Sequence, residues 1–453
     1  MKEKFSKHKT LLTYLLVFMI GLGVLFPIKA DAVVLIKDAE IESTLQIIAN
    51  PIYKVANIDS NSIRIVLIQA PDMNAFVLDN KHIFFTSGLL LELKTPEMLQ
   101  AVIAHEVAHI SSGHLLKNIL NLNTVYNQTS LGLILGIIVA STIGTDAGLA
   151  ISLGFETAAQ NKYFNHSRSQ EIIADAISVK LLRLAQIDPI NSINAMNIFV
   201  EQEKILTINQ NSYSRTHPFS TKRTQNINEI IKQSQKTEYF IDEKLNYLHK
   251  RMLAKLSAFS ENPVDTLKKV DAIEKDEIAL LKKTIALHLK PDQKNAFETL
   301  RKLKKLKPKD PYFMELEGQM YLETGQAAKA IDIFSKASKI LPNESTLLVW
   351  IGISHLAIEK SPNDIKALKV LKTAYDSDPI NPKMLKYLAL AYARNGNIGQ
   401  ASLITAEYFV LLGDFKAAQM HAKRAQKILM SSSVGWQKAK DILDISSKIG
   451  VNN

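Results

Sequence analysis

A repeat of about 34 residues in the second half of the chain constrains the fold more than any other feature. Within residues 311–344, small, aromatic and proline residues occupy fixed repeat positions, namely Gly318, Tyr321, Ala330, Phe334, Ala337 and Pro342. This length suits two amphipathic helices that pack side by side. Small residues let the helices approach, aromatic rings fill the remaining gap, and the proline ends the unit.

Neighbouring segments carry parts of the same pattern. The matches are Ala296, Leu300, Leu303 and Pro308 before this unit, and Gly352, Ala367, Leu371, Ala374, Pro379, Ala389, Tyr392, Ala401, Gly413, Ala418, Ala422 and Ala425 after it. The spacing is typical of tetratricopeptide repeats, which stack into an α-solenoid that binds peptides or proteins. We expect such a repeat domain over residues 239–453, with a generic helical bundle as the alternative.

The N-terminus has the pattern of an export signal. Lysines at positions 2, 4, 7 and 9 precede an apolar run over residues 11–26, and Ala30 and Ala32 suit cleavage after Ala32. We expect residues 1–32 to be a cleavable signal peptide, with a retained signal anchor as the alternative. The chain has no cysteine, which excludes disulfides and thiol catalysis and suits an oxidising periplasm. The predicted location is therefore the periplasm.

Composition describes a globular protein of more than one domain. The chain has 453 residues, of which 47% are hydrophobic and 22% are charged, and this excludes a disordered chain. Its formal net charge is +11. Such a surplus serves solubility, or favours acidic partners and peripheral contact with an anionic membrane surface. We expect no nucleic-acid partner.

The region between the signal and the repeats predicts an α+β domain over residues 33–238. Residues 33–60 have a helical pattern, and residues 62–70 are β-branched and apolar, as in a strand. Two further strands are expected at residues 75–78 and 82–86, joined by the turn sequence Asp79-Asn80-Lys81. The predicted fold class is mostly α: an α+β domain with a small β-sheet, followed by an α-solenoid.

The next helix carries the residues that indicate catalysis. Thr95 and Pro96 form a helix start, and His105, Glu106 and His109 follow within that helix. Histidines four apart share one helix face, so both imidazoles can bind one zinc ion. Glu106 can serve as general base, because a catalytic zinc lowers the pKa of its water to about 7. Two surface histidines on an ordinary helix are the alternative, but the neighbouring residues are apolar.

A third protein ligand is needed to leave one coordination position for water. The pattern with a third histidine fails, because Ser112 and Leu115 stand where it requires glycine and histidine. A glutamate from a later helix is the other option, and Glu171 is the candidate in a helix expected over residues 166–185. Asp175 lies one turn beyond it and can accept a ring N–H from a ligating histidine. A solvated glutamate is the alternative for Glu171.

Residues 40–230 resemble the gluzincin metallopeptidases of the HtpX and CAAX prenyl protease type. That family combines His-Glu-x-x-His with a downstream Glu-x-x-x-Asp. The segments Asn74-Ala75-Phe76, Ile83 to Leu90, and Thr216-His217-Pro218 with Arg223 also look like its motifs. The resemblance implies one Zn²⁺ per chain, held by His105, His109 and Glu171.

The resemblance implies further roles. His217 would stabilise the oxyanion or occupy zinc's fourth site in a latent state. Asn74, Ala75 and Phe76 would lie on an edge strand that pairs with extended substrate. Asp79-Asn80-Lys81 replaces a glycine-rich turn usual in the family, and Phe219 replaces a small residue or proline. These two departures concern the shape of the substrate cleft.

Together with an export signal and repeats, the resemblance implies an endopeptidase that hydrolyses misfolded or stalled outer-membrane proteins. Unfolded or misfolded proteins are the expected substrates, and the outer-membrane barrel-assembly machinery is a candidate partner of the repeats. Two alternatives remain open. One is a non-catalytic chaperone or scaffold that acts through the repeats. The other is a membrane-integral peptidase with spans in the apolar residues 130–154.

Overall fold

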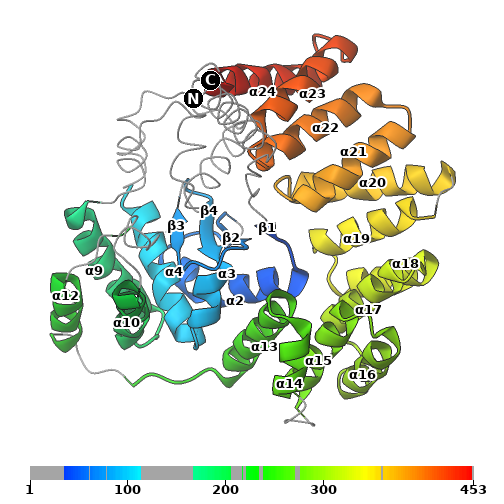
Figure 1. Cartoon of the computed structure of the whole chain (residues 1–453). Helices are drawn as coiled ribbons and strands as arrows, with labels where there is room; N and C mark the ends of the chain where they lie inside the picture. Colours follow the sequence, from blue (N-terminus) through cyan, green and yellow to red (C-terminus); the bar gives the residue numbers. More distant parts are fainter. Residues whose placement is uncertain are drawn as a thin grey trace, which may run out of the picture. The chain divides into compact units, whose positions relative to one another are not determined.

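A computed structural model of the chain is shown in Figure 1. The structure describes a set of ranges with gaps between them: residues 35–60, 62–77, 79–113, 167–205, 217, 221–233, 238–270, 276–358 and 361–450. The expected signal peptide, the apolar segment 130–154 and Phe219 lie outside the described residues. Within the described part, no helix is both long and apolar enough to cross a membrane.

The first part of the chain forms a small mixed β-sheet of four strands. Its strands lie in the order β1-β2-β4-β3, so β3 is at an edge. β2 and β4 are parallel, and the two outer pairs are antiparallel. The strands are β1 (Leu35–Ile36), β2 (Arg64–Ile68), β3 (Ala75–Val77) and β4 (His82–Thr86).

The expected helix over residues 33–60 was wrong at its start. Helix α2 (Ala39–Val55) begins only after Asp38, whose carboxylate accepts the backbone N–H groups of Glu40 and Ile41 at 3.0 Å. Satisfying these otherwise unpaired donors fixes the helix start there. Residues 35–36 pair with β2 instead and extend the sheet.

The two faces of the sheet are both buried. Side chains alternate along each strand. Ile65 and Phe85 belong to a core shared with α2 and with α4 (Pro96–Ser111). Val66 and Phe84, on the opposite face, belong to a hydrophobic cluster shared with the later helices α19 to α22, which lie within residues 345–411. The sheet therefore lies between the helices that carry the candidate site and the repeat helices, and residues 33–453 form one compact unit.

The helices around the sheet begin where local chemistry predicts. Thr95 caps α4 (Pro96–Ser111) by accepting the N–H of Met98 at 3.3 Å. Ser167 and Gln170 form a reciprocal capping box at the start of α9. A short helix, α3, follows β4 and was not anticipated. The remaining bounds are α3 (Ser87–Glu92), α9 (Arg168–Leu184), α10 (Ile190–Ile205) and α12 (Thr221–Lys232).

Paired helices make up the rest of the described chain, which confirms the mostly α fold class. Consecutive helices from α15 onward pack as antiparallel pairs that follow the predicted repeats. Their bounds are α13 (Glu243–Ser260), α14 (Pro263–Val270), α15 (Glu277–Leu289), α16 (Gln293–Leu306), α17 (Pro311–Glu323), α18 (Ala327–Ile340), α19 (Ser345–Leu356), α20 (Ser361–Ser377), α21 (Pro382–Arg394), α22 (Ile398–Leu411), α23 (Phe415–Ile428) and α24 (Val434–Gly450).

The repeat glycine and aromatic residues meet as the pattern predicts. A Cβ atom built on Gly318 would lie 2.5 Å from the ring of Phe334, so only glycine lets α17 approach α18 this closely. Gly352 stands in the same relation to Leu371 between α19 and α20. Phe334 is fully buried and stacks on Trp350, with ring centroids 5.8 Å apart.

Ion pairs tie the repeat helices to the elements around the sheet. Arg251 on α13 pairs with Glu40 on α2 and also binds Asp310, at the start of α17, through two nitrogens at 2.6 and 2.9 Å. Lys255, one turn on, lies 2.8 Å from Asp38 at the start of α2. Lys37 pairs with Asp378, after α20, at 2.9 Å. All three cations are largely buried, so each pair is screened little by solvent.

Candidate metal centre

Two histidines of α4 face one point. His105 and His109 lie on the same side of the helix, and their Nε2 atoms are 3.1 Å apart. Both side chains are buried, because the helix packs between the sheet core and α9. Two ring nitrogens at this separation cannot both carry a proton comfortably, which favours a shared cation between them.

Glu171 meets these histidines from the first turn of α9. Its Oε1 lies 3.3 Å from Nε2 of His109, and its Oε2 lies 3.5 Å from Nε2 of His105. The carboxylate is fully buried. The capping box at Ser167 fixes where α9 begins, and therefore where Glu171 stands on the helix.

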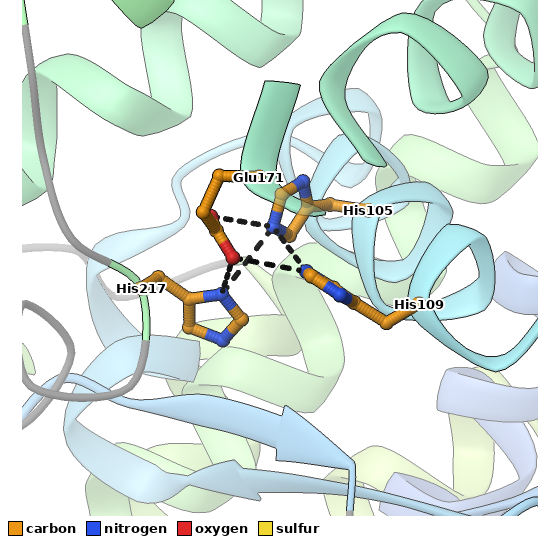
Figure 2. A group of neighbouring side chains, drawn as sticks. All are labelled: His105, His109, Glu171 and His217. Carbon is orange, nitrogen blue, oxygen red and sulfur yellow. Dashed lines mark hydrogen bonds and ion pairs between the residues drawn. The ribbon is translucent and has the colours of Figure 1, made fainter. Parts of the chain in front are cut away.

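His217 completes the group from a segment far along the chain. Its Nδ1 lies 3.4 Å from Nε2 of His105 and 3.2 Å from Oε1 of Glu171. Its other ring nitrogen, Nε2, lies 3.3 Å from the backbone oxygen of Ala75 and 3.5 Å from Oε1 of Glu106. Figure 2 shows the three imidazoles and the carboxylate turned toward a common centre.

The distances fit a tetrahedral cation. Zinc lies about 2.0–2.2 Å from nitrogen and oxygen ligands, so the corners of its tetrahedron are about 3.3–3.6 Å apart. The four donor atoms of His105, His109, Glu171 and His217 all lie within 4.8 Å of one another, and the separations given above range from 3.1 to 3.5 Å. The residues present therefore fit a single metal ion.

Glu106 stands beside this group without taking part in it. It is fully buried, and neither carboxylate oxygen has a hydrogen-bond partner among the described residues. Burial raises its pKa, and the nearby imidazoles only partly offset the effect. A buried carboxylate with unused oxygens can accept a proton from a group brought next to it.

Asp175 and Arg223 hold His105 and Glu171 in place. Asp175 Oδ1 lies 3.1 Å from Nδ1 of His105, so the other ring nitrogen of that histidine faces the centre. Arg223, on α12, contacts both oxygens of Asp175 at 2.8 Å and Oε2 of Glu171 at 2.6 Å. The guanidinium is almost fully buried. One cation thus fixes two carboxylates, one of which faces the metal position.

Comparisons with known proteins identify the family. The sequence profile of peptidase family M48 matches residues 36–231. The chain is 31% identical over 194 residues to the metalloprotease LoiP of Escherichia coli K12, covering 42% of this chain and 70% of that protein. This chain is a member of peptidase family M48. It is a metallopeptidase, and the predicted family resemblance is confirmed.

Two other relatives of this M48 peptidase differ in how much of the chain they match. The "Beta-barrel assembly-enhancing protease" of Yersinia pestis is 22% identical over 389 residues, which is 85% of this chain and 79% of that protein. The mitochondrial metalloendopeptidase OMA1 of Bos taurus is 26% identical over 177 residues, which is 38% of this chain and 32% of that protein. The first match is therefore long enough to include most of the repeat helices, whereas the second covers well under half of the chain.

The charges of the M48 centre depend on its surroundings. Burial alone would lower the pKa of His105, but Asp175 and Glu171 outweigh it and raise the pKa to about 10. Burial lowers the pKa of His109 to about 3. Burial would raise the pKa of Glu171, yet the three imidazoles hold it well below its ordinary value.

The expected substrate strand lies beside the M48 centre. Asn74 precedes β3, and its N–H and C=O both bond to Thr86 at the neighbouring strand β4. The carbonyl of Ala75 instead points away from β4, toward His217. The Phe76 ring stacks on Phe84, with centroids 5.3 Å apart, on the sheet face away from the metal centre.

Sequence reasoning found most of these positions and missed one role. His105, Glu106, His109, Glu171, Asp175 and His217 come together although more than a hundred positions separate the first from the last. Arg223 was noted only as part of a motif, and its contacts with Glu171 and Asp175 were not foreseen. The spacing between Arg223 and His217 did not predict these contacts, because they depend on how α12 packs against α9.

Proposed function

We propose that the chain is a zinc-dependent endopeptidase whose ion is held by His105, His109 and Glu171. The observation that carries the proposal is the convergence of three imidazole nitrogens and one carboxylate at tetrahedral spacing. Imidazole and carboxylate donors in a four-coordinate group suit zinc better than magnesium or calcium, because those two ions prefer sites made only of oxygen ligands. One ion per chain is expected.

The chemistry follows from what each residue can do. A bound zinc ion supplies Lewis acidity toward water and the scissile carbonyl. Glu106 accepts a proton from the attacking water and delivers it to the leaving amine, because neither oxygen of its buried carboxylate is hydrogen-bonded among the described residues. Asp175 and Arg223 hold His105 and Glu171 in orientation, so the ligands need no rearrangement.

His217 has two possible roles, and its position supports the latent one. Its Nδ1 sits at the fourth corner of the donor group, where water must bind for catalysis. While it stays there, no coordination position is free for water. If the imidazole moves aside, its Nε2 can instead donate to the developing oxyanion. We propose that the described state is a resting peptidase.

The edge of the sheet offers a way to bind extended substrate. The outward carbonyl of Ala75 on β3 can accept from a substrate N–H, as in addition of a strand to a sheet. In the resting arrangement, the Nε2 atom of His217 is in contact with this carbonyl oxygen. One movement of His217 would therefore free both the fourth metal position and the substrate strand.

We propose that residues 33–238 form the peptidase domain, residues 239–453 the repeat domain, and residues 1–32 a signal that directs the chain to the periplasm. The pattern of the N-terminal residues and the relative named beta-barrel assembly-enhancing protease support this reading. Misfolded outer-membrane proteins are then the proposed substrates, and the barrel-assembly machinery is a proposed partner. Sequencing the N-terminus of the secreted protein tests the cleavage, and carbonate extraction tests for a retained anchor or spans.

Substituting the proposed base tests the enzymatic assignment. Glu106→Gln keeps the shape of the side chain and removes its ability to accept a proton. Zinc content should stay at one ion per chain, while hydrolysis of an unfolded protein should fall by at least about a hundredfold. Glu97→Gln, in the first turn of the same helix, is the matched control and should retain activity. Equal turnover in wild type and Glu106→Gln would refute the mechanism.

A second substitution separates the roles of His217. His217→Ala should raise the rate of hydrolysis if the imidazole blocks the fourth position. It should lower kcat by about 10²–10³-fold if the imidazole only stabilises the oxyanion. Metal affinity gives an independent reading, because losing a fourth ligand weakens zinc binding, whereas losing an oxyanion donor does not.

A further inference from the structure

The last two described helices contain a stretch in which all the charges have one sign. Residues 415–440 include six lysine and arginine residues and no aspartate or glutamate. The surface of a soluble protein usually mixes both signs of charge. Most of this stretch is helix α23 and the turn that leads to α24. It contributes nothing to the metal centre or to the sheet, so its charge needs another explanation.

The outer face of α23 gathers half of these cations. The inner face of the helix is buried and consists of small residues, namely Ala418, Ala422 and Ala425. Lys416, Lys423 and Lys427 follow one another at helical spacing on the opposite side, and all three are exposed. In the ranges that the structure describes, none of these three lysines forms an ion pair. On α18, by contrast, Lys336 pairs with Asp332 at 2.6 Å. The outer face of α23 is therefore complementary to a dense negative surface.

Large apolar side chains are exposed among these lysines. Met420 lies between Lys416 and Lys423 on the outer face of α23, and its side chain is 60% exposed. Met430, in the turn after α23, and Val434, at the start of α24, are 74% and 76% exposed. A face that only kept the protein soluble would not gather such residues. Any partner must therefore accept apolar groups as well as positive charge.

A lipid bilayer matches this combination better than another macromolecule does. Its phosphates lie above an apolar layer, and an interfacial helix buries apolar side chains about 5–10 Å deep while its lysines reach back to the phosphates. A nucleic acid would pair with the lysines and leave Met420 and Met430 in water. Trp436 follows close behind Val434 and is half-buried. Tryptophan is enriched at the interface between membrane and water, so its presence here also favours a bilayer.

We propose that the outer face of α23 and the turn to α24 bind the surface of a bilayer that contains anionic phospholipid. The three lysines of α23 contact the phosphates, and the exposed Met420, Met430 and Val434 enter the boundary with the acyl chains. The inference goes beyond the proposed function, because it concerns where the protein is held and not what it cleaves.

Vesicle flotation with the mature chain tests the proposal. Vesicles of phosphatidylcholine alone are compared with vesicles that also contain phosphatidylglycerol. Binding to the anionic vesicles should be at least about tenfold tighter and should weaken as the salt concentration rises. Insertion gives a second measurement, because bromine atoms on the acyl chains quench a tryptophan that reaches them. The chain has two tryptophans, so Trp350→Phe leaves Trp436 as the only emitter.

Charge variants locate the binding face. Each lysine near an anionic surface strengthens binding by about fivefold, so removing three should weaken it by about a hundredfold. The test variant combines Lys416→Gln, Lys423→Gln and Lys427→Gln. The matched control removes the same charge from three exposed lysines of α18, with Lys329→Gln, Lys336→Gln and Lys339→Gln. The control chain should bind as the wild type does.

An apolar variant tests the insertion. Met420→Ser, Met430→Ser and Val434→Ser keep every charge and remove the side chains that would enter the bilayer. Quenching of Trp436 by brominated lipid should be lost, and binding should weaken by at least about tenfold. All three positions are exposed, so these substitutions remove no buried packing.

Several results would overturn the membrane proposal. These are equal binding to neutral and anionic vesicles, an equal loss in the α18 control, and vesicle binding that never quenches Trp436. A DNA duplex that binds more tightly than the vesicles would show a general polyanion site and would also overturn it. The comparison of vesicles varies only the lipid, so it holds even if a variant folds poorly. Membrane binding by a chain without hydrolytic activity would overturn the peptidase proposal and leave this one standing.

Discussion

Arg223 offers the sharpest test of how the metal centre is built. Its guanidinium is 3% exposed and contacts two buried carboxylates at 2.6 and 2.8 Å. Arg223→Met keeps the length of the side chain but leaves Glu171 and Asp175 without that cation. Removing one partner of a buried pair costs about 3–5 kcal/mol, because the remaining charges stay buried. For a compact unit of about 420 residues, such a loss lowers the melting temperature by about 3–6 °C.

Metal should rescue much of this loss. A divalent ion next to Glu171 supplies the positive charge that the variant lacks. We therefore expect a large destabilisation in chelator and a smaller one in saturating zinc. Circular dichroism gives the melting temperature, and hydrogen exchange locates the change in α9 and α12. Lys222→Met, the exposed neighbour on α12, is the control. Equal losses with and without zinc, or a loss below about 2 °C in chelator, would refute this account of Arg223.

Further predictions concern the ligand support, the repeat packing and pH. Asp175→Asn should weaken zinc binding by about 10–100-fold in competition with a chelator, because His105 loses its charged partner. Phe334→Ala should destabilise the repeats by about 3–5 kcal/mol in chemical denaturation, whereas Phe240→Ala, at an 86% exposed position, should change little. Burial alone would lower the pKa of His288, but its 2.8 Å contact with Glu323 outweighs burial, so the pKa is raised. That stabilisation is present below the ordinary histidine pKa of about 6.5 and is lost as pH rises through the folded value. His288→Gln should therefore lower the melting temperature more at about pH 5 than at about pH 9, and an equal effect would contradict the pairing.

Local chemistry explains why much of the fold could be predicted. The start of α4 follows from Thr95 and Pro96, which satisfy or remove backbone donors whatever the rest of the chain does. Gly318 and Phe334 fit one another across a helix pair of fixed period, so their contact follows from spacing. β1 was missed because two apolar residues form a strand only when β2 is there to pair with them.

The candidate site was predictable where the chemistry needs a fixed spacing. His105 and His109 share a helix face by geometry, and Glu171 and Asp175 are likewise one turn apart. The arginine that holds both carboxylates was not predictable, because its contact joins α12 to α9 through tertiary packing alone. The charge balance of the site depends on that contact, so the sequence predicted the candidate ligands without the cation that orients them.

The sheet that is covered on both sides limits how this enzyme can be shortened. If the chain ended at about residue 238, Val66, Ile68 and Phe84 would lose the repeat helices that share their hydrophobic cluster. When an apolar sheet face of this kind is exposed to water, it associates with other chains, and the protein aggregates. Producing the catalytic half alone would therefore first require substituting the apolar side chains of that face with polar ones.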